Sequence, residues 1–203
     1  MMPFSRPRCT KAVYHMLRGQ GVTWIPIVQP HAAFVFPDEP WVQPLVTTVP
    51  PGWDGCYWKL NAGLRITDQL DFVHFLCDDD VVQPDFYERM RGSLCRVHIS
   101  SGHRADFPRV GHGKPGLTLA AKENLLPELT GAGQYVVPGW MYAELDFPNS
   151  PGGDFFMLQQ LARRFPFEFH PDAVCYNNLL EPKAWIKEQR DEWCRALMEE
   201  AHL

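Results

Sequence analysis

Three consecutive aspartates, Asp78, Asp79 and Asp80, are the side chains whose type and spacing most directly suggest chemistry in this sequence. They follow residues 72–77, an apolar run interrupted only by His74, which predicts a short strand buried on both faces. The carboxylates would then lie at the carboxyl end of this strand, where open α/β sheets bind ligands. Three neighbouring anions repel one another unless a cation holds them. Because Mg²⁺ uses one or two carboxylates together with phosphate oxygens, we expect a metal-bound diphosphate here.

A purely structural role for this acidic segment stays open. Acidic loops after strands are common, and Asp85 is placed to cap a helix that begins near Pro84.

The segment from Asp78 to Pro84, with its three aspartates and two valines after an apolar strand, resembles the DxD region of GT-A-fold glycosyltransferases, particularly family 2. The resemblance extends over roughly residues 3–176. It implies an enzyme that moves a sugar from a nucleoside-diphospho-sugar, a UDP-sugar by preference, to an acceptor hydroxyl. It also implies that Asp78 and Asp80 bind Mn²⁺ or Mg²⁺ and that Asp78 and Asp79 contact the donor.

Two further segments match the donor side of that family. Residues 3–7 resemble the end of the first strand and its turn, which implies that Pro3, Ser5 and Arg6 lie near the nucleotide. Lys59 and Asn61 match the basic and amide positions of a short helix that faces the donor. The alternative for this second pair is an exposed lysine and an asparagine near a helix end.

The acceptor side is implied by later positions. A Gly-rich loop leads to Asp154 at the start of an amphipathic helix, where the resembling enzymes carry their catalytic base; the alternative is a helix-capping carboxylate. His170 lies where some of these enzymes supply a third metal ligand, although a lone His in an apolar alternation is more often structural. Trp140 and Tyr142 are expected to line the acceptor site by stacking on a sugar, with core or surface packing as the alternative.

The elements that must position these residues alternate between helix and strand. The pattern predicts an α/β three-layer sandwich with a mostly parallel central sheet, and the resemblance implies that this fold is GT-A-like and Rossmann-related. We expect a single domain over residues 1–203, ending in an amphipathic helix at about 182–201 that would also suit a homodimer interface. The expected helices cover residues 7–20, 56–64, 84–92, 117–126, 154–165 and 182–201, and the expected strands cover 22–28, 44–50, 72–77, 95–100, 134–140, 167–170 and 173–176.

Composition narrows the classes of protein. With 203 residues, 45% of them hydrophobic, one compact core is expected. A net charge of −5 without a basic run argues against nucleic-acid binding. We expect no membrane span and a cytoplasmic location, because no apolar run approaches the roughly 20 residues that a span needs. The six cysteines form no CxxC pair, so we expect reduced core thiols.

Two other functions compete with sugar transfer. A non-catalytic nucleotide-binding or nucleotide-sugar-binding protein is favoured by the short first strand and by the single acid at Asp154. A metal-dependent phosphohydrolase or nucleotidyltransferase would also place carboxylates after a strand. The residues after the second predicted strand, Gln29 to His31, lack the acid that contacts the base in the resembling family, so the nucleotide stays open.

Overall fold

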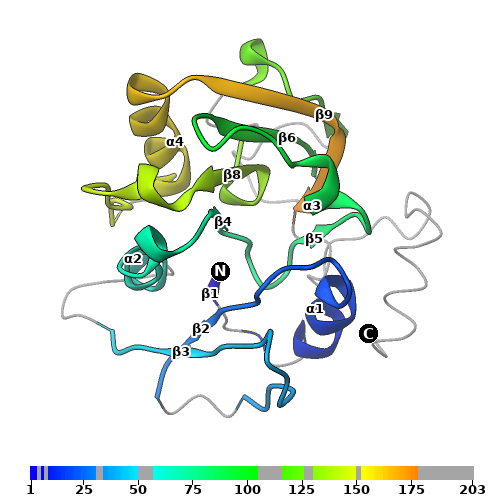
Figure 1. Ribbon diagram of the computed structural model, residues 1–203, viewed down its shortest axis with the longest axis vertical. Coiled ribbons are helices and arrows are strands. Elements are labelled where there is room, and N and C mark those ends of the chain that lie inside the picture. The colour runs from blue at the N-terminus through cyan, green and yellow to red at the C-terminus, as the bar shows by residue number, and fades with distance from the viewer. Residues whose placement is uncertain are drawn as a thin grey trace.

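The computed structural model describes residues 1–3, 6, 9–30, 34–49, 57–104, 116–125, 130–149 and 152–177 (Figure 1). The α-helices are α1 (Thr10–Leu17), α2 (Tyr57–Leu64), α3 (Phe86–Arg89) and α4 (Gly153–Arg164). The strands are β1 (Met2–Pro3), β2 (Pro26–Val28), β3 (Leu45–Val46), β4 (Phe72–His74), β5 (Val81–Val82), β6 (Val97–Arg104), β7 (Gly116–Thr118), β8 (Tyr135–Pro138) and β9 (Phe167–Asn177). Short 3₁₀ turns are η2 (Thr67–Gln69), η3 (Lys122–Asn124), η4 (Ala132–Gln134) and η5 (Gly139–Tyr142).

The strands form two sheets that meet at the start of the chain. The smaller sheet is parallel, with the order β1-β2-β3. The larger sheet has the order β4-β8-β6-β9-β5, and β7 pairs with β6. The Met1 nitrogen donates to the His74 carbonyl (2.6 Å), and the Leu76 nitrogen donates to the Met1 carbonyl (3.0 Å). One residue thus bridges two alternate residues of its neighbour, as in a parallel ladder, and ties the small sheet to the segment that follows β4.

The predicted mostly parallel central sheet is wrong, and with it the GT-A-like, Rossmann-related three-layer sandwich. In the larger sheet β4–β8, β8–β6, β6–β7 and β5–β9 are all antiparallel, and only β6–β9 is parallel. The physical reason is the connection between β6 and β8. Parallel neighbours need a crossover, usually a helix, whereas the predicted helix at 117–126 is instead β7 followed by the single turn η3.

Other predicted elements are found near their expected positions. The helices at 7–20, 56–64, 84–92 and 154–165 correspond to the shorter α1 to α4, and the predicted strands overlap observed ones. The two strands expected at 167–170 and 173–176 are one strand, β9, which passes a bulge opposite Ser100 and Ser101. The predicted helix at 182–201, and any dimer formed through it, lie outside the described residues.

Side-chain alternation along the strands builds a hydrophobic core on each face of the larger sheet. In β8, Tyr135 and Val137 enter the core that contains α4, whereas Val136 enters the core that contains α1 and α3. Successive strand residues point to opposite faces, so a strand covered on both sides needs apolar residues throughout. Helix α1 shows the complementary pattern, because its buried residues, Ala12, Val13, Met16 and Leu17, share one face.

The directions of the strands define two ends of the larger sheet. Strands β4, β6 and β9 run in one direction, and β8 runs against them. The carboxyl ends of β4, β6 and β9 therefore meet the start of β8, and we call this the aspartate end because residues 78–80 follow β4. The starts of β4, β6 and β9 meet the end of β8 at the opposite end, which we call the histidine end.

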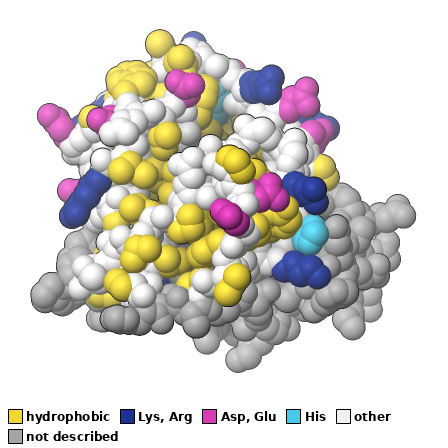
Figure 2. Space-filling view, turned by 60° about the horizontal axis from the view of Figure 1, so that its bottom comes forward, with side chains coloured by type: hydrophobic (Ala, Val, Ile, Leu, Met, Phe, Trp, Pro, Cys, Tyr) yellow, Lys and Arg dark blue, Asp and Glu magenta, His cyan; other side chains and the backbone are white. Residues whose placement is uncertain are grey.

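The molecular surface adds two observations. Among the described residues no helix is both long and apolar enough to cross a membrane. Figure 2 shows hydrophobic side chains gathered near the middle of the face that lies at the foot of Figure 1. In and around β3, the side chains of Val35, Val46 and Val49 are exposed.

A buried histidine, His74, contacts both Tyr87 of α3 and the turn that precedes β8. His74 lies at the end of β4, with Nδ1 3.0 Å from the Tyr87 hydroxyl and Nε2 2.9 Å from the Gly133 carbonyl. A carbonyl only accepts, so Nε2 carries the proton and Nδ1 accepts from Tyr87. Burial lowers the pKa of His74 to about 3, with the positive chain terminus adding to the effect. The ring is therefore neutral, and each nitrogen has a hydrogen-bond partner.

This neutral histidine predicts acid sensitivity. The unfolded chain binds a proton at His74 near pH 6.5, whereas the folded chain does so only near pH 3, so stability falls as the pH drops through this window. The slope contributed by one such group is about 1.4 kcal/mol per pH unit. Urea unfolding of wild type and His74→Gln at pH 7, 6 and 5 should show the smaller loss in the variant. Parallel losses in both proteins would contradict this account of His74.

Candidate functional site

The three aspartates lie in a tight turn at the aspartate end. The Asp80 nitrogen donates to the Cys77 carbonyl (3.1 Å), and Asp80 Oδ2 accepts from the Cys77 nitrogen (3.3 Å). All three aspartates are buried, with 1%, 2% and 5% of their surface exposed in chain order. Buried carboxylates are costly unless cations or hydrogen bonds compensate for lost water, so this turn is an unusual place for three of them.

Arg6 supplies a cation to two of these aspartates. Its guanidinium pairs with Asp78 through NH1 and with Asp79 through NH2, where the nitrogen lies 3.2 Å from Oδ2. The Arg6 backbone nitrogen also donates to Asp78 Oδ2 at 2.7 Å. These bonds link the connection after β1 to the turn after β4. A guanidinium that is one-third exposed while its carboxylates are buried faces both the protein and the solvent.

A second turn, at residues 131–134, lies against the aspartates. The Gln134 nitrogen donates to the Gly131 carbonyl (3.0 Å), and the Gly131 nitrogen donates to the Gln134 side chain (3.0 Å). Ser100 donates to the Gln134 carbonyl (3.2 Å), and His74 donates to that of Gly133. Hydrogen bonds from β4 and β6 therefore fix this turn, which we call the 131–134 turn.

Asp80 and Asp154 both contact the 131–134 turn. A Cβ added to Gly133 would lie 3.0 Å from Asp80 Oδ2 and 2.9 Å from the Cys175 sulfur, so only a glycine fits there without displacement. The neighbouring Ala132 nitrogen donates to Asp154 Oδ2 at 3.3 Å. The predicted metal-binding and catalytic carboxylates are thus held by adjacent residues of one turn. Burial, and then the negative charge of Asp80, raise the pKa of Cys175, so this thiol stays protonated.

The start of α4 is fixed by residues of α2. Gly152, with φ 79°, turns the chain into α4, and the Gly153 nitrogen donates to the Tyr57 hydroxyl (3.1 Å). Asn61 makes two bonds to Phe147: its amide donates to the carbonyl (2.9 Å), and its oxygen accepts from the nitrogen (2.7 Å). In this structure Asn61 therefore holds the segment before α4.

The structure brings together three of the residues predicted for the donor side, Arg6, Asp78 and Asp79. Asp80 and Asp154 each contact the neighbouring 131–134 turn. Pro3 is buried in β1, and Ser5 lies outside the described residues. Lys59 is buried in α2, where its Nζ lies 5.6 Å from the centre of the Trp58 ring.

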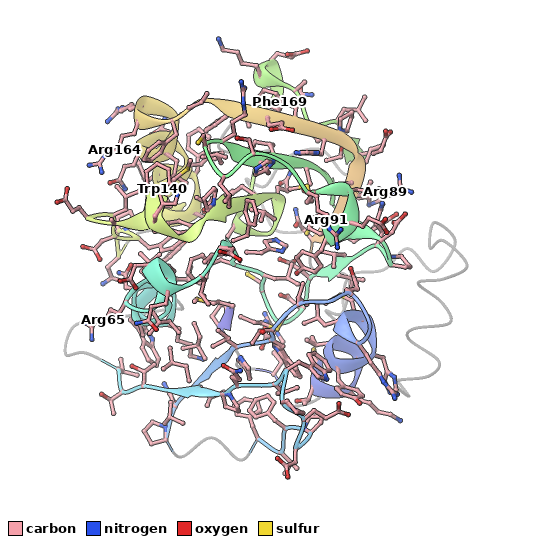
Figure 3. The ribbon with its side chains drawn as sticks, in the orientation of Figure 1. Arg65, Arg89, Arg91, Trp140, Arg164 and Phe169 are labelled. Carbon is pink, nitrogen blue, oxygen red and sulfur yellow. The ribbon has the colours of Figure 1, made fainter. Side chains whose placement is uncertain are left out.

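Of the two predicted acceptor residues, Trp140 lies at the other end of the sheet and Tyr142 is buried in the core. Trp140 follows β8 at the histidine end, where its indole nitrogen donates to the Leu94 carbonyl (3.1 Å) and its ring packs edge-on against Phe165. Figure 3 shows it on the side of Arg164, at the carboxyl end of α4. Tyr142 is 2% exposed and packs against Phe75, and its hydroxyl has no hydrogen-bond partner among the described residues. The Trp140 ring therefore lies at the opposite end of α4 from Asp154, whereas Tyr142 packs on Phe75, which also contacts Phe147 in the segment before α4.

His170 also lies away from the aspartates. It pairs with Ser100, whereas Tyr176, which pairs with Val81 next to Asp80, lies opposite His103. The three intervening steps along β6 correspond to roughly 10 Å. The Nε2 of His170 instead lies 2.9 Å from Nδ1 of His98.

The aspartates do not converge on a single point in this conformation. Among the described residues, the one group of three or more His, Cys, Asp or Glu side chains whose ligand atoms lie close enough to share a metal is His98, Glu168 and His170. Any metal held by Asp78 and Asp80 would therefore need their carboxylates to rotate or a ligand to complete the sphere. A cavity of about 610 Å³ lies nearby, between the end of α1 and α3, but the aspartates do not line it.

Sequence reasoning missed several residues that shape this site. Gly133, Tyr57 and the His98–Glu168 pair carry no motif that singles them out. The sequence contains one indication that His98, Glu168 and His170 lie together. Glu168 and His170 are two residues apart in an alternating strand, which places both on one face, and His98 occupies a similar alternation in residues 95–100.

No family model matches the chain, and no curated protein matches it. The functional argument therefore rests on the residues and their geometry.

The packing of Gly133 predicts an asymmetric response to two alanine substitutions. Gly133→Ala would push against Asp80 and Cys175 and should destabilise the protein by about 1–3 kcal/mol. Gly131→Ala is the matched control, because its Cβ would lie 3.5 Å from Asp154 Oδ2, an ordinary contact, at a φ of −119°. Chemical denaturation measures both. Equal destabilisation would show that the turn is not packed as described.

Proposed function

We propose that this protein is a metal-dependent transferase that moves a sugar from a nucleoside-diphospho-sugar to an acceptor hydroxyl. The observation that carries the proposal is the contact of the 131–134 turn with both Asp80 and Asp154, next to the pairing of Arg6 with Asp78 and Asp79. A transferase of this kind needs a cation site for the diphosphate and a carboxylate for the acceptor proton, within reach of one another.

The pairing of Arg6 supports a diphosphate ligand. A guanidinium matches carboxylate and phosphate equally well because both accept paired hydrogen bonds. Without ligand, Arg6 pairs with Asp78 and Asp79. When a divalent cation binds Asp78 and Asp80, Arg6 can exchange a carboxylate for a phosphate oxygen while staying near the cluster. Mn²⁺ or Mg²⁺ suits the oxygen ligands, and UDP is the nucleotide that the sequence resemblance favours.

The aspartate cluster and Asp154 have separate roles in the proposed reaction. The acceptor oxygen forms a bond to the anomeric carbon, and the bond from that carbon to the diphosphate breaks, with its electron pair leaving on the diphosphate. Arg6 stabilises the negative charge that develops there, and a metal held by Asp78 and Asp80 would supply further positive charge. Asp154 accepts the proton of the acceptor hydroxyl.

A second candidate is a nucleotide-binding protein without turnover. The specific observation in its favour is the state of Asp154, whose Oδ2 accepts a backbone hydrogen bond from Ala132. Because one oxygen of this carboxylate is engaged in a hydrogen bond to the turn, the proton of the acceptor hydroxyl would have to be taken by the other oxygen. Nucleotide binding without sugar transfer is the outcome that would identify this function.

The metal-diphosphate site predicts metal-dependent stabilisation by nucleotide. UDP should raise the melting temperature more with Mn²⁺ than with a chelator, because a ligand stabilises the folded state by mass action. Asp80→Asn should remove this difference. Asp68→Asn, which removes the same charge from an exposed position in η2, should keep it. An equal UDP shift with and without Mn²⁺ in the wild type would reject the site.

The role of Asp154 predicts a separation of binding from transfer. Asp154→Asn should bind Mn²⁺ and UDP like wild type but transfer sugar about 10²- to 10⁴-fold more slowly, since general-base removal typically has this effect. Transfer is measured with radiolabelled UDP-sugars and a panel of hydroxyl acceptors. Asp146→Asn, an exposed carboxylate in the loop before α4, is the control and should transfer normally. Unchanged transfer in Asp154→Asn would make Asp154 structural.

A further inference from the structure

We propose that His98, Glu168 and His170 form a second metal site, at the histidine end of the sheet, that binds Zn²⁺ or a similar transition-metal ion. The site is independent of the proposed transferase chemistry, because it shares no residue with the aspartate end. Its three ligand atoms lie within 4.8 Å of one another.

The sheet itself brings these side chains together. His98 of β6 lies directly opposite Glu168 of the parallel neighbour β9, and His170 lies two residues further along β9 on the same face. The two rings are 5.1 Å apart between centroids. In Figure 3 the labelled Phe169 marks this part of β9, between the two ligands that the strand contributes.

The hydrogen bonds of His98 orient a lone pair toward the centre of the cluster. Its Nε2 lies 3.0 Å from the Ser93 carbonyl, so Nε2 carries the proton, and Nδ1 of the neutral ring carries a lone pair. Nδ1 faces His170 Nε2 at 2.9 Å. Metal-binding histidines commonly donate their second nitrogen to a backbone carbonyl, which fixes the tautomer and the ring. The His170 ring also hydrogen-bonds the backbone of Arg89, which offers a place for its own proton.

The ligand separations lie on either side of the spacing that a tetrahedral ion requires. The pairs formed by His98 Nδ1, His170 Nε2 and the Glu168 oxygens are 2.9, 3.9 and 4.0 Å apart. Zn–N and Zn–O bonds of about 2.1 Å place tetrahedral ligands about 3.4 Å from one another. Glu168 is too far from either ring for a direct hydrogen bond. An ion bound between the three side chains would bridge this distance. Nitrogen ligands favour Zn²⁺ over Mg²⁺ or Ca²⁺.

The metal site is closely packed on one side and exposed to solvent on the other. A Cβ added to Gly92 would lie 2.3 Å from His98 Cε1 and 3.0 Å from Glu168 Oε1, so the segment after α3 packs directly on the cluster. Phe72 covers His98 edge-on. The side chains of Glu168 and His170 are 35% and 13% exposed, which leaves a path for a fourth ligand such as water. Three protein ligands and one open position are typical of catalytic zinc sites.

The competing explanation is a simple hydrogen bond from His170 to His98. It accounts for the 2.9 Å distance, but it leaves the approach of Glu168 to both rings without a function. The two explanations differ in what happens when metal is added.

The test uses the full chain, treated with chelator and titrated with Co²⁺, whose visible absorption becomes intense in four-coordinate sites. We expect one intensely absorbing, four-coordinate Co²⁺ per chain, displaced by Zn²⁺. Glu168→Gln and His170→Gln should each weaken Co²⁺ binding by at least about tenfold, since even the loss of a residue that only orients a ligand costs that much. Gly92→Ala should also weaken it, because it displaces two ligands without removing either.

Two controls separate this site from others. His15→Gln removes a histidine from α1, and Asp80→Asn removes a carboxylate from the aspartate end, so both should bind Co²⁺ like wild type. Absence of the Co²⁺ absorption in folded wild-type protein would overturn the proposal. Binding that survives both Glu168→Gln and His170→Gln, or that disappears in Asp80→Asn, would also overturn it. Failure of the UDP experiments would leave this result unaffected, because they report on a different end of the sheet.

Discussion

The close packing of the 131–134 turn is the constraint on which the candidate site depends. The turn receives hydrogen bonds from β4 through His74 and from β6 through Ser100, and it contacts Asp80 at Gly133. Two strands therefore fix the position of this turn between the acidic turn and the start of α4. A site assembled on loops alone would lack this rigidity, and positioning is much of what a protein contributes to catalysis.

The same turn explains why a neutral histidine is buried beside three carboxylates. A charged His74 would attract the aspartates, but its ring is enclosed by Tyr87, Phe86 and the Gly133 carbonyl. Desolvation opposes the charged form more strongly than the single carbonyl favours it. His74 thus acts as a dipole that orders the backbone, and the cationic role beside the carboxylates belongs to Arg6.

Local pattern predicted much of the secondary structure but not the sheet. The apolar face of α1 and the buried run of β4 were readable because burial acts residue by residue along one element. Strand direction depends on the connections between strands. One connection, the stretch near Leu117, was wrongly predicted to be a helix, and this error made the predicted sheet parallel instead of mostly antiparallel. In the same way, the sequence resemblance placed Arg6 near Asp78, and the two are paired, whereas Asp154 is linked to the 131–134 turn through Ala132. It did not reveal that β8 carries Trp140 to the opposite end of α4 from Asp154.

The chemistry of sites was predictable only where residues are adjacent in sequence. Three aspartates in a row stand out in any reading. His98 and Glu168 are 70 residues apart and meet only because β6 and β9 are neighbours, which no local pattern encodes. His170 was predicted to act with the aspartates, yet its observed neighbours are one histidine and one glutamate, and the added imidazole favours a different class of metal.

The bulge in β9 has a consequence for how the two ends communicate. Paired residues step from His170 to Val174 on β9 while they advance only from Ser100 to Ser101 on β6, so residues 171–173 contribute no rung to the ladder. Backbone opening on one side of this gap need not spread to the other, and local unfolding follows such cooperative units. The bulge thus divides the strand into two paired segments, 167–170 and 174–177. If these segments open independently, ligands at the two ends bind with additive free energies.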